Sequence, residues 1–272
     1  MRLAALLCAA LLALPLHAKD EPKEGVDVQR SRLLLLPAAT VEKSASQQYS
    51  QMMRSAAQQN ALNVDRQQVE RLRNIARALI PHSTRFNADA ARWRWEVNLL
   101  SSKQVNAFCM PGGKIAFFTG ILEQLQLTDD EVAVIMGHEI GHALLEHGRA
   151  RMSQQVLKNV GISVAAAVFN LGQVSAELLG QAANLAVSLP YARKQETDSD
   201  LVGMELAARA GFDPRAAVSV WQKMQKLGQK TGGGQPPQFL STHPSHESRI
   251  REIEANLPKV LPLLPASARK PS

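Results

Sequence analysis

The chain has 272 residues, a formal net charge of +7 at pH 7 and 45% hydrophobic residues, which suits one sizeable globular domain with a small appendage. Aromatic residues make up only 4% of the chain, whereas single-strand nucleic-acid binders interleave aromatic rings with their basic residues. We therefore expect no nucleic-acid partner, and we interpret the basic excess as a solvated surface that can lie against anionic membranes.

The first residues have the pattern of a secretory signal peptide. Arg2 precedes an apolar run from Leu3 to Leu16, and the small residue Ala18 stands where a leader is cleaved. The apolar run is too short to span a bilayer comfortably. We expect residues 1–18 to be removed, leaving a periplasmic chain that has no transmembrane helix and whose single cysteine, Cys109, cannot form an intramolecular disulfide.

The next residues, 19–59, form an N-terminal segment ahead of the main domain, which we expect over residues 60–257. Apolar residues at helical spacing predict the first helix of that domain between Val64 and Ile80, with Asn63 or Asp65 as its cap.

A small antiparallel sheet is predicted next. Apolar and polar residues alternate from Trp93 to Leu99, and a Pro-Gly-Gly turn divides the run from Val105 to Thr119 into two further strands. The edge of the last strand can pair with an extended peptide by strand addition. Ordinary sheet and turn chemistry explains the same residues equally well. The candidate substrate-binding residues are Asn106, Gly113, Ile115 and Phe117.

The helix pattern that follows the sheet carries the clearest chemical signal. Thr128 and Glu131 form a capping box, so His138 and His142 fall in mid-helix. Since a helix advances about 100° per residue, these two imidazoles project from one face and can bind a common zinc ion, with Glu139 as the general base. The alternative is a pair of hydrogen-bonded histidines in an apolar core, which is costly unless both are partnered.

The segment from Val156 to Leu189 is rich in Ala, Val and Leu but is interrupted by polar residues. It predicts one or two buried or amphipathic helices over the active-site cleft; a hairpin that dips into a membrane is the alternative. Further helices are predicted at Gln195–Ala210, Pro214–Leu227 and Ser245–Leu257, and a disordered tail over residues 258–272.

A catalytic zinc ion takes three protein ligands and a water molecule, so a third ligand is needed. Helical arithmetic turns His147 away from the pair, and we leave it out of the site. Glu196 and Asp200 stand four apart on one helix face, so Glu196 can reach the metal while Asp200 accepts a hydrogen bond from a ligand histidine. An acidic first helical turn is the alternative interpretation. Glu177 and Glu205 are the other candidate ligands.

Four segments resemble the gluzincin metallopeptidases that include the CAAX prenyl endopeptidases, HtpX and the periplasmic peptidases BepA and LoiP. The resemblance covers roughly residues 60–255. It implies an α+β, predominantly helical zincin-like fold with the small antiparallel sheet beside the HExxH helix, one Zn²⁺ per chain, Glu196 as third ligand and Glu139 as base. The segments are VNAFCMPGGKIAFFTGIL, MGHEIGHALLEH, ARKQETDSDLVG and STHPSHESRI.

The same resemblance places His243 near the zinc ion, where it either donates to an oxyanion or covers the open coordination position. Arg249 is expected to tether this loop to a carboxylate. Ser199 stands where the family usually has alanine, a change that leaves the ligand face intact. The spanning helices of membrane members and the repeat domain of BepA have no counterpart in the sequence.

These observations predict a zinc metalloendopeptidase that hydrolyses internal peptide bonds of unfolded or misassembled cell-envelope proteins, with water activated by zinc and Glu139. One alternative is a gated, chaperone-like protein that binds peptides and keeps a resting zinc site. Another is a purely structural zinc site, for which His243 is the candidate fourth ligand.

Overall fold

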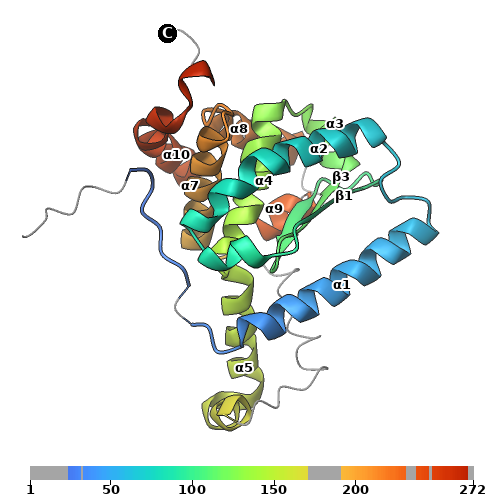
Figure 1. Cartoon of the computed structure of the whole chain (residues 1–272), viewed down its shortest axis with the longest axis vertical. Helices are drawn as coiled ribbons and strands as arrows, with labels where there is room; N and C mark the ends of the chain where they lie inside the picture. The colour runs from blue at the N-terminus through green and yellow to red at the C-terminus, as the bar shows by residue number, and fades with distance from the viewer. Residues whose placement is uncertain (1–23, 32, 171–190, 231–236, 245–246, 269–272) are drawn as a thin grey trace, which may run out of the picture.

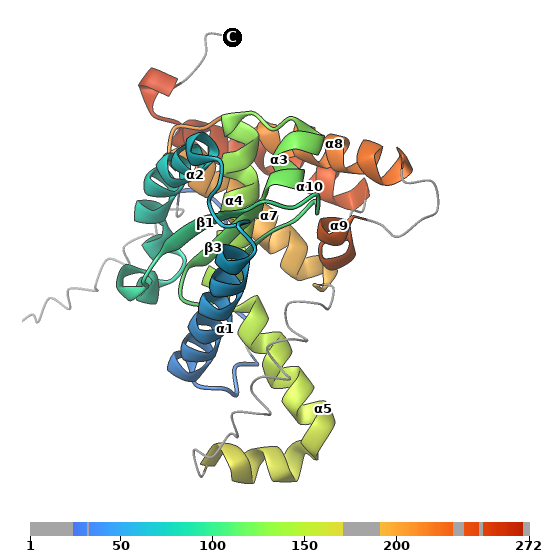
Figure 2. The ribbon, with the colours of Figure 1, turned by 90° about the vertical axis from the view of Figure 1, so that its right-hand side faces the viewer.

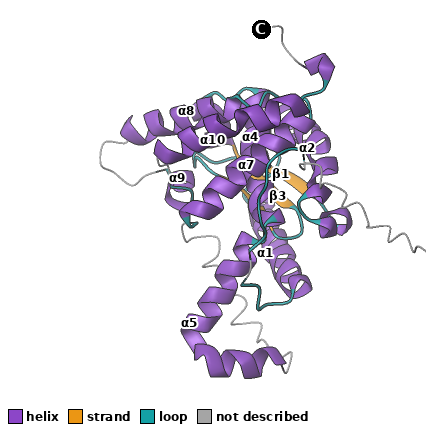
Figure 3. Cartoon of the chain, turned by 90° about the vertical axis from the view of Figure 1, so that its left-hand side faces the viewer, coloured by secondary structure: helices purple, strands orange, loops and turns teal. Residues whose placement is uncertain are grey.

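The computed structural model describes residues 24–31, 33–170, 191–230, 237–244 and 247–268, so the expected leader at residues 1–18 lies outside the described part. Helices dominate this part of the chain, and a small sheet lies among them (Figure 3). In chain order the elements are α1 (Ala38–Gln58), α2 (Arg66–Leu79), η1 (Ile80–Arg85), η2 (Ala88–Arg92), β1 (Glu96–Leu100), β2 (Ala107–Met110), β3 (Lys114–Phe118), α3 (Thr119–Leu125), α4 (Asp129–Leu144), α5 (His147–Asn170), α7 (Arg193–Arg209), α8 (Ala216–Lys230), α9 (Gln238–Thr242), α10 (Glu247–Val260), η3 (Leu261–Leu263) and η4 (Ala266–Ala268).

Helix α4 is the centre of the fold, with α7 and α8 packed on one side and the sheet on the other (Figure 1). Every residue from Glu131 to Leu144 is buried. Its start follows the predicted capping box, in which the Thr128 hydroxyl accepts from the amide of Glu131 and the Glu131 carboxylate accepts from the amide of Thr128. Asp65 caps α2, one of the two caps that the sequence offers for that helix.

The sheet has three strands in the order β1-β3-β2, so the predicted small sheet is present. It is mixed and not purely antiparallel, because β1 runs parallel to β3 while β2 and β3 form the hairpin. The hairpin turn needs glycine, since Gly112 and Gly113 have φ of 82° and 79°. Alternating hydrophobicity identifies strands but not which strand lies between the others, and β3 is the central one.

Helix α1 covers one face of the sheet, and α4 lies against the other (Figures 1 and 2). Ala45, Tyr49 and Met53 of α1 form one apolar cluster with sheet residues, whereas Ile115 and Phe117 belong to the main core with α4. The Tyr49 hydroxyl also donates to the carbonyl oxygen of Ile115 at 2.5 Å. The N-terminal segment is therefore part of the folded body.

Helix α5 extends away from the other helices (Figure 2). It includes the first part of the apolar segment predicted to be helical, and residues 171–190 lie outside the described part. Among the residues that the structure describes, no helix combines the length and the apolar character needed to cross a membrane.

At the C-terminal end the structure differs from the disordered tail that the sequence predicts. Helix α10 continues to Val260, and η3 and η4 follow it as far as Ala268. Val260 and Leu264 are buried against the core. Pro258 lies within α10 and Pro262 within η3, so these prolines do not prevent helical structure, and the apolar residues gain from burial.

Candidate metal centre

The close packing of α4 on α7 brings the predicted ligands together. Gly137 and Gly203 face each other at this crossing: a Cβ atom on Gly203 would lie 2.7 Å from the backbone nitrogen of His138, and one on Gly137 would lie 2.8 Å from the carbonyl oxygen of Gly203. Only glycine fits at such a separation. The two helix axes therefore approach closely, and Glu196 from the first turn of α7 reaches the histidines of α4.

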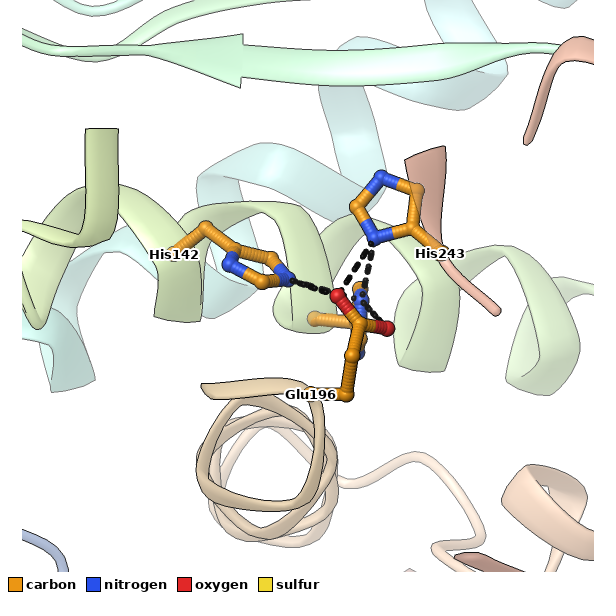
Figure 4. Close-up of side chains that lie close together, drawn as sticks. His142, Glu196 and His243 are labelled. Carbon is orange, nitrogen blue, oxygen red and sulfur yellow. Dashed lines mark hydrogen bonds and ion pairs between the residues drawn. The ribbon is translucent and has the colours of Figure 1, made fainter. Parts of the chain in front are cut away.

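Four side chains converge at this point: His138, His142, Glu196 and His243. Nε2 of His138 lies 3.1 Å from Nε2 of His142, and Glu196 Oε1 lies 3.3 Å from His142 Nε2. Figure 4 shows the Glu196 carboxylate directed from α7 toward the imidazoles of His142 and His243. Nδ1 of His243 is 3.2 Å from His138 Nε2 and 3.1 Å from Glu196 Oε1.

This donor set fits a zinc ion. Zinc bonds of about 2.0–2.1 Å in a tetrahedral arrangement put ligand atoms roughly 3.3 Å apart. The Nε2 atoms of His138 and His142 are 3.1 Å apart, His142 Nε2 is 3.3 Å from Glu196 Oε1, and His138 Nε2 is 3.7 Å from the other carboxylate oxygen, Oε2. Burial lowers the pKa of His142 well below its usual value, which keeps the imidazole in the neutral form that binds metal. The four side chains are 0 to 3% exposed, so the cluster is shielded from solvent.

Asp200 and Arg249 form hydrogen bonds to the predicted ligand residues His138 and Glu196. Asp200 Oδ1 lies 2.9 Å from Nδ1 of His138, which leaves Nε2 of that ring directed at the cluster. Arg249 donates to both oxygens of Asp200 at 2.7 Å and also to Glu196. Burial alone would raise the pKa of Glu196, but the charges of His243 and Arg249 lower it well below its usual value. The guanidinium group also stacks on Trp221, 3.6 Å from the ring centroid.

The prediction that His147 faces away from the site is wrong. Helix α4 ends at Leu144, and Glu146 adopts a left-handed backbone with φ of 57°, so the helical arithmetic no longer applies beyond it. Nδ1 of His147 lies 3.0 Å from Nδ1 of His142. Burial lowers the pKa of His147 to about 3, so the ring is neutral and can accept the outer proton of His142. The sequence has no glycine at the turn that would have marked this helix end.

The carboxylate of Glu139 lies beside the cluster. It is 2% exposed, and burial raises its pKa despite the opposing effect of His243 and His138. Its Oε1 atom lies 3.4 Å from Nε2 of His243, yet it has no hydrogen-bond partner among the described residues. A buried oxygen of this kind is free to exchange a proton with a molecule bound in front of it.

Tyr191, immediately before α7, is a site residue that the sequence analysis missed. Its ring stacks on His142 with centroids 3.7 Å apart, and the guanidinium carbon of Arg151 lies 3.5 Å from the Tyr191 ring centroid. The backbone amide of Tyr191 donates to the carbonyl oxygen of Thr242, next to His243. Tyr191 is one of two tyrosines in the chain, which is the only sequence signal that could have drawn attention to it.

Among the candidate substrate-binding residues, the prediction is wrong for Ile115 and Phe117. Both lie on the central strand β3 and are fully buried, so neither the edge nor their side chains can meet a peptide. Gly113 is covered by Trp95, 2.6 Å from where its Cβ would lie. Asn106 does line a cavity that also contains Glu139 and His243.

The two alternative third ligands are not part of the cluster. Glu205 lies farther along α7 and is fully buried. It accepts from the backbone amide of Val26 at 2.6 Å and forms ion pairs with Arg85 and Arg209. Glu177 lies outside the residues that the structure describes.

Comparisons with known proteins agree with this arrangement. The family model described as Peptidase family M48 matches residues 66–257. Mitochondrial metalloendopeptidase OMA1 of Arabidopsis thaliana is 39% identical over 164 residues, which are 60% of this chain and 32% of that protein. Metalloprotease LoiP of Escherichia coli is 28% identical over 68% of each chain. The Beta-barrel assembly-enhancing protease of Yersinia pestis is 26% identical over 67% of this chain and 38% of its own. The chain spans only 32 to 48% of the length of the OMA1 relatives.

Proposed function

Because this chain belongs to peptidase family M48, we propose that it is a zinc-dependent endopeptidase that hydrolyses internal peptide bonds. The observation that carries the proposal is that one buried cluster contains both a set of metal-binding side chains and a carboxylate that can act as a base. His138, His142 and Glu196 supply three donors for one ion, and Glu139 places a carboxylate oxygen without a described hydrogen-bond partner beside them. The relatives named as metalloendopeptidases support the same activity.

In the proposed reaction, His138, His142 and Glu196 hold the ion. When bound, zinc polarises a carbonyl group and lowers the pKa of water. Glu139 takes a proton from water as the hydroxide adds to the scissile carbonyl carbon, and its raised pKa favours holding that proton. It then returns the proton to the leaving amine as the carbon–nitrogen bond breaks. Arg249 and Asp200 keep the ligand side chains in place throughout.

We infer that the strand available to an extended peptide is β2 and not β3. Strands β1 and β2 are the two edges of the sheet, and the residues of β2 line the cavity that contains Glu139. The amide of Phe118 donates to the carbonyl oxygen of Asn106, so in the alternating antiparallel pattern the main chain of Ala107 and Cys109 faces away from β3. The side chain of Asn106 accepts from the Ala107 amide. A peptide that pairs with this edge would replace the Asn106 side chain as the acceptor for the Ala107 amide.

We further propose that the substrates are unfolded or misassembled cell-envelope proteins and that the chain acts in the periplasm. The leader pattern of residues 1–18 and the name of the Yersinia pestis relative support this proposal. The OMA1 relatives are named as mitochondrial, so they do not argue for the compartment.

The position of His243 favours a second candidate function, a gated peptide-binding protein with a resting zinc site. Its Nδ1 atom lies within 3.2 Å of His138 and Glu196, where it can act as a fourth donor. Phe239 stacks on the His243 ring with centroids 4.5 Å apart and supports it from behind. A site closed in this way would bind peptides without cleaving them until His243 moves.

The first test compares casein cleavage and zinc content of the wild-type chain and Glu139→Gln. The endopeptidase loses turnover in the variant and keeps about one zinc ion per chain. If neither protein cleaves casein while zinc is bound, the gated alternative is favoured, and His243→Ala should then produce cleavage. A structural zinc site would instead make His243→Ala lower the melting temperature without producing activity.

A further inference from the structure

One cavity of about 100 Å³ opens directly beside the proposed catalytic base. Glu139, Tyr191 and His243 line its inner end. Its remaining wall combines the edge strand, the start of α5, one face of α1 and α9, and it includes the polar side chains of Gln48, Asn106, Gln238 and Thr242. The apolar side chains there are Val41, Ala45, Phe108, Met110 and Met152. Since one small cavity contains both the base and this apolar wall, a side chain that fills it belongs to a residue next to the bond being cleaved.

The α1 wall comes from outside residues 66–257, the part of the chain that the family model matches. The match begins at residue 66, whereas α1 ends at Gln58. Val41 and Ala45 are four apart and therefore share one face of α1, and both are buried at 2% and 6% exposure. The segment before residue 66 thus contributes directly to the space in front of Glu139.

Helix α1 is attached to the rest of the protein at several points along its length. Before its start, the amide of Leu35 donates to the hydroxyl of Ser153 at 3.1 Å, and Arg149 donates to the carbonyl oxygen of Leu36. Leu36 itself is fully buried. Farther along, the hydroxyl of Tyr49 donates to the central strand of the sheet. These contacts tie α1 to α5 and to the sheet at separate points.

The size and lining of the cavity define what it accepts. A buried apolar cavity of about 150 Å³ holds a benzene molecule, so a cavity of about 100 Å³ suits an aliphatic side chain and is too small for an aromatic one. We propose that Val41 and Ala45 of α1 form the wall of a specificity pocket that takes an aliphatic side chain adjacent to the scissile bond. This proposal rests on the endopeptidase function proposed above.

The test measures cleavage preference in the full chain with zinc bound. Casein fragments produced by the wild type are sequenced by mass spectrometry, and we expect aliphatic residues to be enriched at one position next to the cleaved bond. Two fluorogenic peptides that carry Leu or Ala at that position are then compared by kcat/KM. Ala45→Leu fills the pocket and should lower the Leu-to-Ala ratio of kcat/KM by about 10-fold or more. Val41→Ala enlarges it and should admit Phe at the same position.

Ala39→Leu is the matched control, because Ala39 is exposed on the same helix; its ratio should equal that of the wild type. A ratio of two substrates does not depend on how much enzyme is active, so a general loss of folding does not imitate the result. The proposal is overturned if wild-type fragments show no enrichment, or if Ala45→Leu keeps the wild-type Leu-to-Ala ratio and Val41→Ala does not cleave the Phe peptide any faster than the wild type does. If the zinc-bound wild type cleaves nothing, the endopeptidase proposal fails. Peptide binding then tests the pocket separately: the pocket proposal is also overturned if the Leu and Ala peptides have equal dissociation constants in the wild type and in Ala45→Leu.

Discussion

The closest backbone approach in the site gives the sharpest prediction, for Gly203→Ala. The new Cβ atom would lie 2.7 Å from the backbone nitrogen of His138 and 3.0 Å from the carbonyl carbon of Gly137. Alanine in a helix interior gains about 1 kcal/mol over glycine, but overpacking typically costs about 1–3 kcal/mol. Because backbone atoms cannot rotate away as a side chain can, we take the upper end of the overpacking cost. After the gain from alanine, the free energy of unfolding should fall by about 1–2 kcal/mol. At roughly 2–4 °C per kcal/mol, the melting temperature should fall by about 2–8 °C.

Separating α4 from α7 also moves Glu196 away from the histidines, so zinc affinity should fall with stability. Thermal unfolding and zinc content after equilibrium dialysis measure the two effects. Gly228→Ala is the matched control: its nearest neighbour would be the methyl group Cδ1 of Leu240 at 3.2 Å, a flexible side chain that can give way. That variant should be neutral or more stable. A Gly203→Ala protein that is stabilised like the control and binds zinc normally would refute the close-packing argument.

Three further outcomes are expected. His147→Ala should lower zinc affinity about 10- to 100-fold in competition with a chelator while the chain stays folded, because the proton acceptor of a ligand histidine is lost; unchanged affinity would contradict that role. Arg249→Met should destabilise the chain by about 3–5 kcal/mol in urea unfolding, since two buried carboxylates lose their cation; a loss below about 1 kcal/mol would count against it. Gly25→Ala, with its φ of 107° and its Cβ position 2.3 Å from Glu205, should release the N-terminal segment to limited proteolysis, and a cleavage pattern like that of the wild type would show that the segment stays docked.

The parts of the site that sequence could predict are those fixed by local spacing. His138, Glu139 and His142 depend only on the periodicity of one helix and its capping box, and both features can be read from consecutive residues. Glu196 and Asp200 follow the same rule on α7, and the sequence favours Glu196 over Glu205 because Glu205 has no second carboxylate one turn away. The structure brings His138, His142 and Glu196 together through glycines at the helix crossing.

The parts that sequence could not predict depend on where the chain turns or which elements meet. His147 lies in the site because Glu146 adopts a left-handed backbone conformation, for which glutamate has no special tendency. The central position of β3 follows from how the β2–β3 hairpin meets β1, and alternation within each strand does not contain that information. The same limit applies to α1, whose apolar face predicts burial but not its place beside Glu139.

The two kinds of donor in the cluster are held in different ways, which explains how one site could be both stable and gated. His138, His142 and Glu196 stand on α4 and α7, which are locked by glycine contacts and by Arg249. His243 follows the short helix α9. Main-chain bonds from Tyr191 to Thr242 and from Phe239 to Val105 hold this segment, and Arg249 donates to the carbonyl oxygen of Pro244. Moving the segment breaks these separate contacts, whereas separating the two long helices breaks the core. We therefore expect His243 to leave the cluster more easily than the other three donors.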